Sequence, residues 1–345
     1  MRTTAALAVV ASAAPSSAFV PLGPPLKGGA RSTSMPAMHA VAEAAARAAW
    51  LESNQSPFWS PPDTAYGVTS AGVVGAASPA ASAAAALAVS AASAAAAPTS
   101  TFLHAPAEYF AEHLLEAKGS RAAGGSLVDV GDPYDFSRPL VKGGSWNGAS
   151  VGSWACTAGG WDSPKLRPTT EVFLVLNGEG CVTDADGVPH HMGPGDVVVL
   201  PKHWHGRWDI TQSIHKIWVV HNHDDVPGAA DGIVRAVVQQ VPGLAAAVLP
   251  MVDGPMYAAP ANLAQPIYDL GPTSVGFLTC APGAFEVAPR DSAEVLFVTE
   301  GAFFMTNADG SAQRCAAGDT IVLPVGWSGR WDIIEPTTTV WTEAR

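Results

Sequence analysis

The chain has 345 residues, of which 14% are charged, and its formal net charge is −12 at pH 7. That length exceeds one ordinary domain and suits two. Its 18 Lys and Arg residues form no cluster, which excludes a duplex-binding surface, so we expect no nucleic-acid partner. Nine of the eleven Trp residues lie between Trp146 and Trp341, which places the folded core in the C-terminal part of the chain.

The N-terminus has the composition of a targeting sequence. Residues 1–18 combine a positive start, a short apolar run and small residues, which is typical of a secretory signal peptide. Residues 19–35 add basic and hydroxyl side chains without an acid, which is typical of a plastid transit peptide. The Ala18-Phe19 junction resembles the bipartite presequence of algae with secondary red plastids. We therefore expect residues 1–35 to direct the protein to such a plastid, to the stroma or thylakoid lumen, with secretion as the alternative.

Residues 36–125 read as an Ala-rich low-complexity region with two short helices, at 40–51 and 105–118. Within it, residues 71–97 contain sixteen Ala among twenty-seven and no charged side chain. Alanine buries little area, so this stretch is only weakly apolar. Three interpretations stay open: a linker, which we favour, a second targeting signal, and a membrane anchor.

An internal duplication dominates the rest of the chain. Residues 194–210 align with residues 317–333 at eleven identities in seventeen positions. Two further pairs of segments align in the same order, 150–161 with 274–285 and 170–180 with 293–303. Such self-similarity indicates one structural unit built twice.

Each copy has the pattern of an all-β unit. Short runs rich in Val, Leu and aromatic residues alternate with turn pairs such as Asn177-Gly178 and Pro194-Gly195. We predict two jelly-roll barrels in tandem, at 126–223 and 270–345, joined by a linker at 224–269. Four scattered cysteines form no C-x-x-C pair and are expected to be buried free thiols: Cys156, Cys181, Cys280 and Cys315.

The order Gly-x-Trp-x-Cys-Thr, Thr-Glu-Val-Phe, Asp-Gly, Pro-Gly-Asp and Trp-x-Gly-x-Trp resembles the cupins. The resemblance is strongest to the subgroup that contains ureidoglycine aminohydrolase and the ethanolamine-utilisation cupins. It covers residues 150–221 and 274–341, and it implies a bicupin. It implies no single activity, because cupins support many chemistries.

The resemblance also implies a metal site of two His, one Glu and a third His in each barrel. Glu171 and Glu294 stand at the glutamate position. The histidine positions hold Lys165, Arg167 and Gly206 in the first copy, and Ala288, Arg290 and Gly329 in the second. We therefore expect no metal and no other cofactor. The alternative is manganese or another divalent ion held by Glu171 with His203 and His205.

The replaced positions suggest a ligand site instead. Strand alternation would turn Trp204, Gly206 and Trp208 inward around an apolar slot that suits a flat ligand. The second copy repeats this pattern with Trp327, Gly329 and Trp331. In the other interpretation, which we favour, these indoles simply fill the barrels as core.

A charged pair recurs at the same spacing in both copies. Arg167 and Glu171, like Arg290 and Glu294, are predicted to converge on each other as a structural pair or as an anchor for a polar ligand. An unpaired buried Glu171 would have a raised pKa and could act as a general acid or base, so it is the candidate catalytic residue.

The sequence favours a metal-free bicupin in a plastid that binds a small molecule or has a structural role, and whether it is an enzyme stays open. The alternative is a metal-dependent cupin in the first barrel that hydrolyses a C–N bond of a small ureide. That alternative needs a histidine soon after Glu171, where residues 172–176 have none. A third class is a membrane-bound interaction protein held through residues 71–97. Exposed sheet edges would favour a homo-oligomer.

Overall fold

The computed structural model describes residues 101–143, 146–226, 232, 234–243 and 262–345, and their regular structure is nearly all β-strand. This confirms the all-β prediction. Among these residues, no helix is long and apolar enough to cross a membrane. Residues 1–35 and 71–97 lie outside the described residues, so plastid targeting and the three interpretations of the Ala-rich stretch stay predictions.

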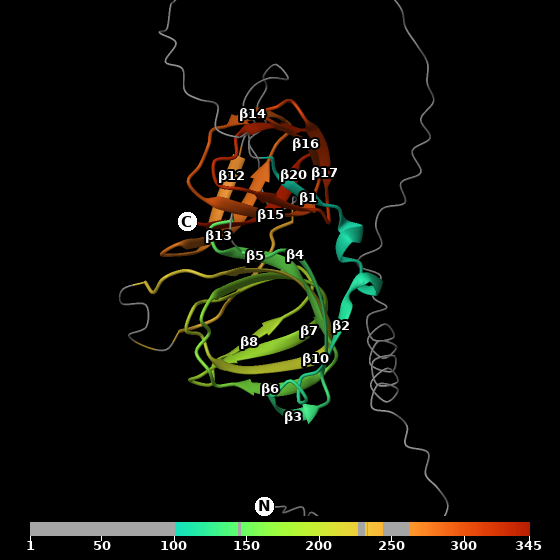
Figure 1. Ribbon diagram of the computed structural model, residues 1–345, viewed down its shortest axis with the longest axis vertical. Helices are drawn as coiled ribbons and strands as arrows, with labels where there is room; N and C mark the ends of the chain where they lie inside the picture. The colour runs from blue at the N-terminus through green and yellow to red at the C-terminus, as the bar shows by residue number, and fades with distance from the viewer. Residues whose placement is uncertain (1–100, 144–145, 227–231, 233, 244–261) are drawn as a thin grey trace, which may run out of the picture. The chain divides into compact units, whose positions relative to one another are not determined.

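One ten-stranded sheet closes into the first barrel, called barrel 1 below (Figure 1, green to yellow). Its main path has the order β11-β9-β7-β10-β5-β4-β2, while β6 pairs with β10 and β3, and β8 pairs with β7. Register shifts around Gln212 and His215 let the long strands β7 and β10 curve as a pair. The strands are β2 (Glu116–Ser120), β3 (Leu127–Gly131), β4 (Tyr134–Val141), β5 (Ala149–Cys156), β6 (Gly159–Ser163), β7 (Thr170–Asp184), β8 (Pro189–Met192), β9 (Asp196–Leu200), β10 (Gly206–His221) and β11 (Val237–Gln240).

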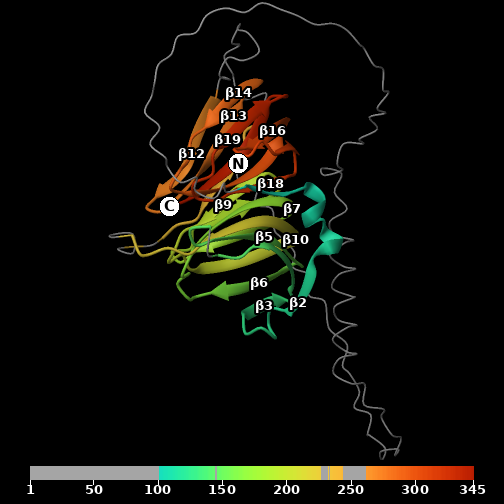
Figure 2. The ribbon, with the colours of Figure 1, turned by 45° about the horizontal axis from the view of Figure 1, so that its top comes forward.

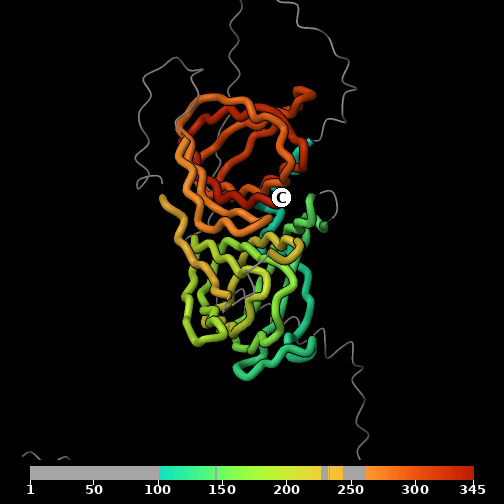
Figure 3. Tube along the Cα trace, turned by 90° about the vertical axis from the view of Figure 1, so that its left-hand side faces the viewer, coloured from blue at the N-terminus to red at the C-terminus, as the bar shows by residue number. Residues whose placement is uncertain are grey.

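The second barrel, barrel 2, consists of a six-stranded sheet in the order β1-β18-β15-β20-β13-β12 and a four-stranded sheet in the order β14-β19-β16-β17. Figure 3 shows the two barrels as separate rounded tubes, green-yellow and orange-red. The strands are β1 (Leu103–Ala105), β12 (Asn262–Leu270), β13 (Thr273–Cys280), β14 (Gly283–Val287), β15 (Ala293–Glu300), β16 (Ala302–Asn307), β17 (Ala312–Ala316), β18 (Thr320–Leu323), β19 (Gly329–Ile333) and β20 (Thr337–Ala344).

Segments expected to lie outside the barrels contribute strands to them. The helix predicted at 105–118 is replaced by two 3-10 turns, η2 (Ala107–Phe110) and η3 (Glu112–Leu114), and by the start of β2. Its regularly spaced glutamates gave a helical pattern, but sheet pairing on either side decides the local structure. β11 lies inside the predicted linker, and β12 begins eight residues before position 270.

A glycine has the same left-handed backbone conformation at the equivalent position of both copies. Gly178 and Gly301 each have φ +81°, a left-handed conformation that other residues rarely adopt. A Cβ at these positions would lie 2.0 Å from the carbonyl oxygen of Ser213 and 2.1 Å from that of Pro336, respectively. The glycine seven residues after each motif glutamate is therefore required by the backbone and carries no chemistry.

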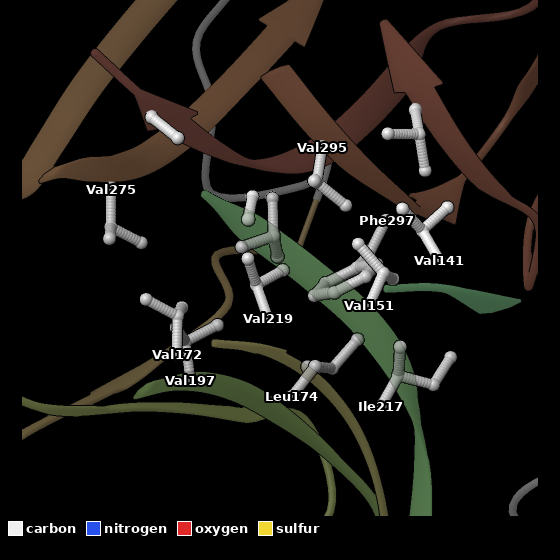
Figure 4. Packing of buried hydrophobic residues seen from close by; sticks show 14 of the residues in the cluster. Val141, Val151, Val172, Leu174, Val197, Ile217, Val219, Val275, Val295 and Phe297 are labelled. Atoms are coloured by element: carbon white, nitrogen blue, oxygen red, sulfur yellow. The ribbon is translucent and has the colours of Figure 1, made fainter. Parts of the chain in front are cut away.

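Three larger clusters of buried apolar side chains hold the described residues together. One belongs to barrel 1 and another to barrel 2. The remaining one draws from both barrels, and Figure 4 shows Val151, Val172 and Val219 of barrel 1 close to Val275 and Val295 of barrel 2. Small β-branched side chains suit this shared layer because they pack densely between two sheets. All four cysteines are free and buried, which confirms that prediction.

Candidate functional site

The motif glutamate of barrel 1 forms ion pairs with two cationic side chains. Glu171 on β7 is 7% exposed, and its Oε1 accepts a hydrogen bond of 2.8 Å from Nζ of Lys216 on the adjacent strand β10. Its Oε2 accepts from Nη2 of Arg167. Burial alone would raise the pKa of Glu171, but the charges of Lys216 and Arg167 lower it to about 2. The predicted Arg167–Glu171 pair is confirmed, and the carboxyl group is ionised at neutral pH, so it is no general acid.

Lys216 is a buried ammonium group inside an aromatic box. Its Nζ lies 3.7 Å from the ring centroid of Phe173, 4.7 Å from that of Trp208 and 4.8 Å from that of Trp154. Burial lowers the pKa of Lys216, while Glu171 acts in the opposite direction. The negative faces of the three rings and the ionised carboxylate both favour the charged amine.

The guanidinium group of Arg121 also lies in this region, although Arg121 belongs to a segment outside the sequence repeat. Arg121 lies in the turn between β2 and β3, and strand β3 pairs with β6 (Figure 2). Its Nη1 donates to both carboxylate oxygens of Asp135 at 3.1 Å, and its guanidinium carbon lies 4.2 Å above the Trp161 ring. Sequence analysis missed Arg121 because it assigned this stretch to the low-complexity region.

These groups line one cavity of about 320 Å³ in barrel 1. Its wall carries three cationic side chains, one carboxylate, four indoles, two hydroxyl groups and one valine: Arg121, Arg167, Lys216, Glu171, Trp154, Trp161, Trp208, Trp218, Ser137, Ser163 and Val220. Polar groups fixed among aromatic walls are typical of small-molecule sites. The cavity can therefore hold and orient a compact ligand.

The structure has no slot around Gly206, and the favoured interpretation, in which the indoles are core, is confirmed for Trp204. Strand β10 begins only at Gly206, and the preceding residues form a turn in which the Trp204 amide donates to Pro201. A Cβ on Gly206 would lie 2.0 Å from the carbonyl oxygen of Thr183, so glycine is needed for close packing. Trp204 is fully buried core, whereas Trp208 is both part of the core and a wall of the cavity.

The two histidines of the alternative metal site lie in the turn before β10. His203 has a left-handed φ of 72°, and its Nε2 lies 3.0 Å from Asp225, while His205 contacts the carbonyl oxygen of His203. Neither lines the cavity that contains Glu171. In the described part of the chain, no group of three His, Cys, Asp or Glu side chains could hold a metal ion. A carboxylate already bound to two cations does not fit such an ion.

A serine–histidine pair on β5 and β10 has a structural arrangement. Nε2 of His215 lies 2.7 Å from Oγ of Ser153, and both side chains are buried. The serine hydroxyl donates to the carbonyl oxygen of Lys216 at 3.1 Å, so the histidine donates to the serine. A base that donates its proton to the hydroxyl cannot activate it, and the pair therefore builds no nucleophile.

The equivalent positions in barrel 2 form a different interior. Nη1 of Arg290 lies 3.0 Å from Oε2 of Glu294, which confirms the predicted pair. Burial raises the pKa of Glu294, Arg290 counteracts this rise, and Glu343 adds to it. Trp331 stacks on Phe303 at 4.8 Å between ring centroids. Trp327 is likewise buried core, and a Cβ on Gly329 would lie 2.2 Å from the Thr306 carbonyl oxygen, so this copy has no slot either.

Comparison with known proteins identifies the domains. Residues 146–218 and 268–339 match the EutQ-like cupin domain. A putative glyoxylate-induced protein from Pseudomonas aeruginosa is 17% identical, with a TM-score of 0.52, over 74% of this chain and 92% of that one. A protein of unknown function from Pseudomonas syringae pv. tomato is 15% identical, with a TM-score of 0.47, over 61% of this chain and 86% of that one. No curated protein sequence matched.

The two domain matches coincide with the two sequence copies and with the two barrels. The structural similarity to the Pseudomonas aeruginosa protein extends over both of them and shows the fold. The cupin resemblance inferred from the motifs is thereby confirmed. This chain is a bicupin with two EutQ-like cupin domains in tandem.

Proposed function

We propose that barrel 1 is a metal-free binding site for a small molecule and that barrel 2 supports it structurally. The observation that carries this proposal is the pairing of Glu171 with Lys216 and Arg167 in the wall of the cavity. Two side-chain cations there neutralise the carboxylate that would otherwise serve a metal ion. Lys216 and Arg167 would thus supply the positive charge that a metal ion supplies in a metal-dependent site.

The aromatic surroundings support binding rather than turnover. Burial lowers the pKa of Lys216, but its amine is hydrogen-bonded to the ionised Glu171 and enclosed by aromatic rings, and an amine held in such an ion pair is a poor nucleophile. Glu171 is held ionised by its two partners and so has no proton to donate. The cavity therefore offers fixed charges and apolar walls, which are features of a recognition site.

Elemental analysis of the full chain, expressed without a His-tag and purified without a chelator, tests the metal-free proposal. We expect much less than one metal ion per chain. About one transition-metal ion per chain, lost in the His203→Ala and His205→Ala variants, would overturn the proposal. That outcome would favour the alternative, a metal-dependent cupin hydrolase in barrel 1. A Lys165→Ala variant is the matched control, since this residue replaces a motif histidine but has no donor role in either proposal.

A further inference from the structure

The charges around the barrel 1 cavity do not cancel. Arg121, Arg167 and Lys216 contribute three positive charges, and Glu171 and Asp135 contribute two negative ones. The excess of one positive charge lies in a partly enclosed, aromatic environment, where it is screened less than on a surface. An anion with a single charge would balance it.

The two guanidinium groups also have unused donor capacity. Each carries five N–H donors. Within the described residues, Arg121 donates through Nη1 to Asp135, and Arg167 donates through Nη2 to Glu171. The Nε group of each is buried without an acceptor in the same part of the chain. An oxyanion in the cavity would add acceptors to guanidinium groups that the protein satisfies only in part.

The remaining wall indicates what the anion is attached to. Trp161 is covered by Arg121 on one side and stacks with Trp208 at 5.9 Å between ring centroids. The half-buried indoles Trp154 and Trp218 line the same cavity together with Val220. These surfaces favour a flat apolar body over a fully hydrated ion such as phosphate. A second negative charge would also be repelled by the ionised Glu171.

We propose that the barrel 1 cavity binds an organic monocarboxylate with a flat apolar body, its carboxylate facing Arg121 and Arg167. This inference rests on the proposed function, because it names the class of ligand for the same site. Guanidinium groups bind carboxylates through paired N–H donors, which gives both affinity and orientation. The indoles provide the surface for the body of the ligand.

Calorimetric titration of the full chain with benzoate, phenylacetate and indole-3-acetate tests the inference, with the amide of each acid as its neutral counterpart. We expect at least one acid to bind about ten-fold or more tightly than its amide, because the amide loses the charge-assisted hydrogen bonds. Inorganic phosphate is a further arm, and we expect it to bind more weakly than that acid.

Two variants of Arg121 and one control variant in barrel 2 locate the bound acid. Arg121→Met should abolish the preference for the acid over the amide, whereas Arg290→Met, its control in barrel 2, should leave it unchanged. Arg121→Lys keeps the charge without the planar fork and should retain part of the preference. Circular dichroism of each variant confirms that it is folded.

Each other outcome has a defined meaning. Equal binding of an acid and its amide would overturn the carboxylate inference and leave the small-molecule site intact. Preferential binding of phosphate would also overturn the inference. If no acid and no amide binds at about millimolar concentration, both the inference and the proposed binding function are overturned.

Discussion

Barrels 1 and 2 have the same type of backbone fold, but the side chains in their interiors differ. Repeated positions build the scaffold: Gly178 and Gly301 have the same left-handed conformation, and Trp204 and Trp327 occupy the same core position. The cavity positions are repeated only in part, since Arg167, Glu171, Trp208 and Trp218 recur but the other lining residues do not. By strand register and alignment, Lys216 corresponds to Thr339, Trp154 to Leu278 and Val220 to Glu343. The comparison teaches that recurring residues build the scaffold and the Arg–Glu pair, whereas Lys216 and the other residues that do not recur give the barrel 1 cavity its own character.

The same Arg–Glu spacing even has opposite electrostatic results in the two barrels. The pKa of Glu171 falls because Lys216 and Arg167 outweigh the effect of burial. The pKa of Glu294 rises because burial and the neighbouring Glu343 outweigh Arg290, whose side chain is half exposed. A pair motif therefore fixes geometry, while its surroundings fix the charge state.

The largest difference between the barrels should appear when each glutamate is neutralised. Glu171→Gln leaves the buried Lys216 without its counter-charge, and we expect the free energy of unfolding to fall by about 3–5 kcal/mol. Glu294→Gln should change it by less than about 1 kcal/mol, because folding already disfavours the ionised form of this carboxyl group. Urea denaturation followed by tryptophan fluorescence measures both. Equal losses would show that the two pairs are equivalent.

The next largest difference should be in how the stability of each barrel changes as the pH falls. Burial lowers the pKa of His215 to about 4, and burial together with His223 lowers that of His221 to about 4, against an ordinary value of 6.5. Between pH 4 and pH 6.5, these two histidines bind protons in the unfolded chain but not in the native chain. The stabilisation is therefore complete above pH 6.5 and is lost as the pH falls towards 4, on the order of 3 kcal/mol for His215.

Barrel 2 should respond less to acid. Residues 262–345 contain no histidine, and as the pH falls the raised pKa of Glu294 and the lowered pKa of Glu343 act on stability in opposite directions. Hydrogen exchange at pH 7 and pH 5, corrected for intrinsic rates, measures the two barrels in one sample. We expect barrel 1 peptides to lose protection first. Earlier loss in barrel 2 would refute this assignment of the buried histidines.

The smallest effect concerns a side chain that accepts hydrogen bonds from a buried indole and a backbone amide in both barrels. In barrel 1, Oδ1 of Asp184 accepts from Nε1 of Trp204 at 2.7 Å and from the amide of Ala236 at 3.0 Å, and its Oδ2 lies 2.7 Å from Nε2 of His190. Asn307 makes the first two contacts in barrel 2, with Trp327 and Phe102. The charged version adds a hydrogen bond to a histidine.

Asp184→Asn should therefore cost about 1 kcal/mol, because a charge-assisted hydrogen bond becomes a neutral one. Ser311→Ala removes the exposed partner of Asn307 and should cost less than about 0.5 kcal/mol. Thermal unfolding of both variants checks this order. A larger loss for Ser311→Ala would show that the hydrogen bonds of Asn307 to Trp327 and Phe102 depend on its contact with Ser311.

The sequence alone predicted the duplication, the all-β class and both Arg–Glu pairs, because these follow from local spacing. It also predicted Trp204 as a core residue, but it missed the turn before Gly206, since strict alternation fails where His203 has a positive φ. Lys216 had a detectable signal, a single cation within the apolar run 214–220, but that signal does not reveal its partner on another strand. Arg121 had none, because its role depends on a long-range contact.

Strand β1 precedes barrel 1 in the chain but pairs with β18 of barrel 2. His104 within β1 lies 2.8 Å from Asp319, although 215 positions separate the two residues in sequence. During synthesis on the ribosome, β1 therefore emerges long before its partner and must wait while barrel 1 is completed. Closing so long a loop is entropically costly and slow. Strand β18 must be synthesised before barrel 2 gains this edge strand, so a chain that stalls between the barrels would carry an unpaired strand exposed to aggregation.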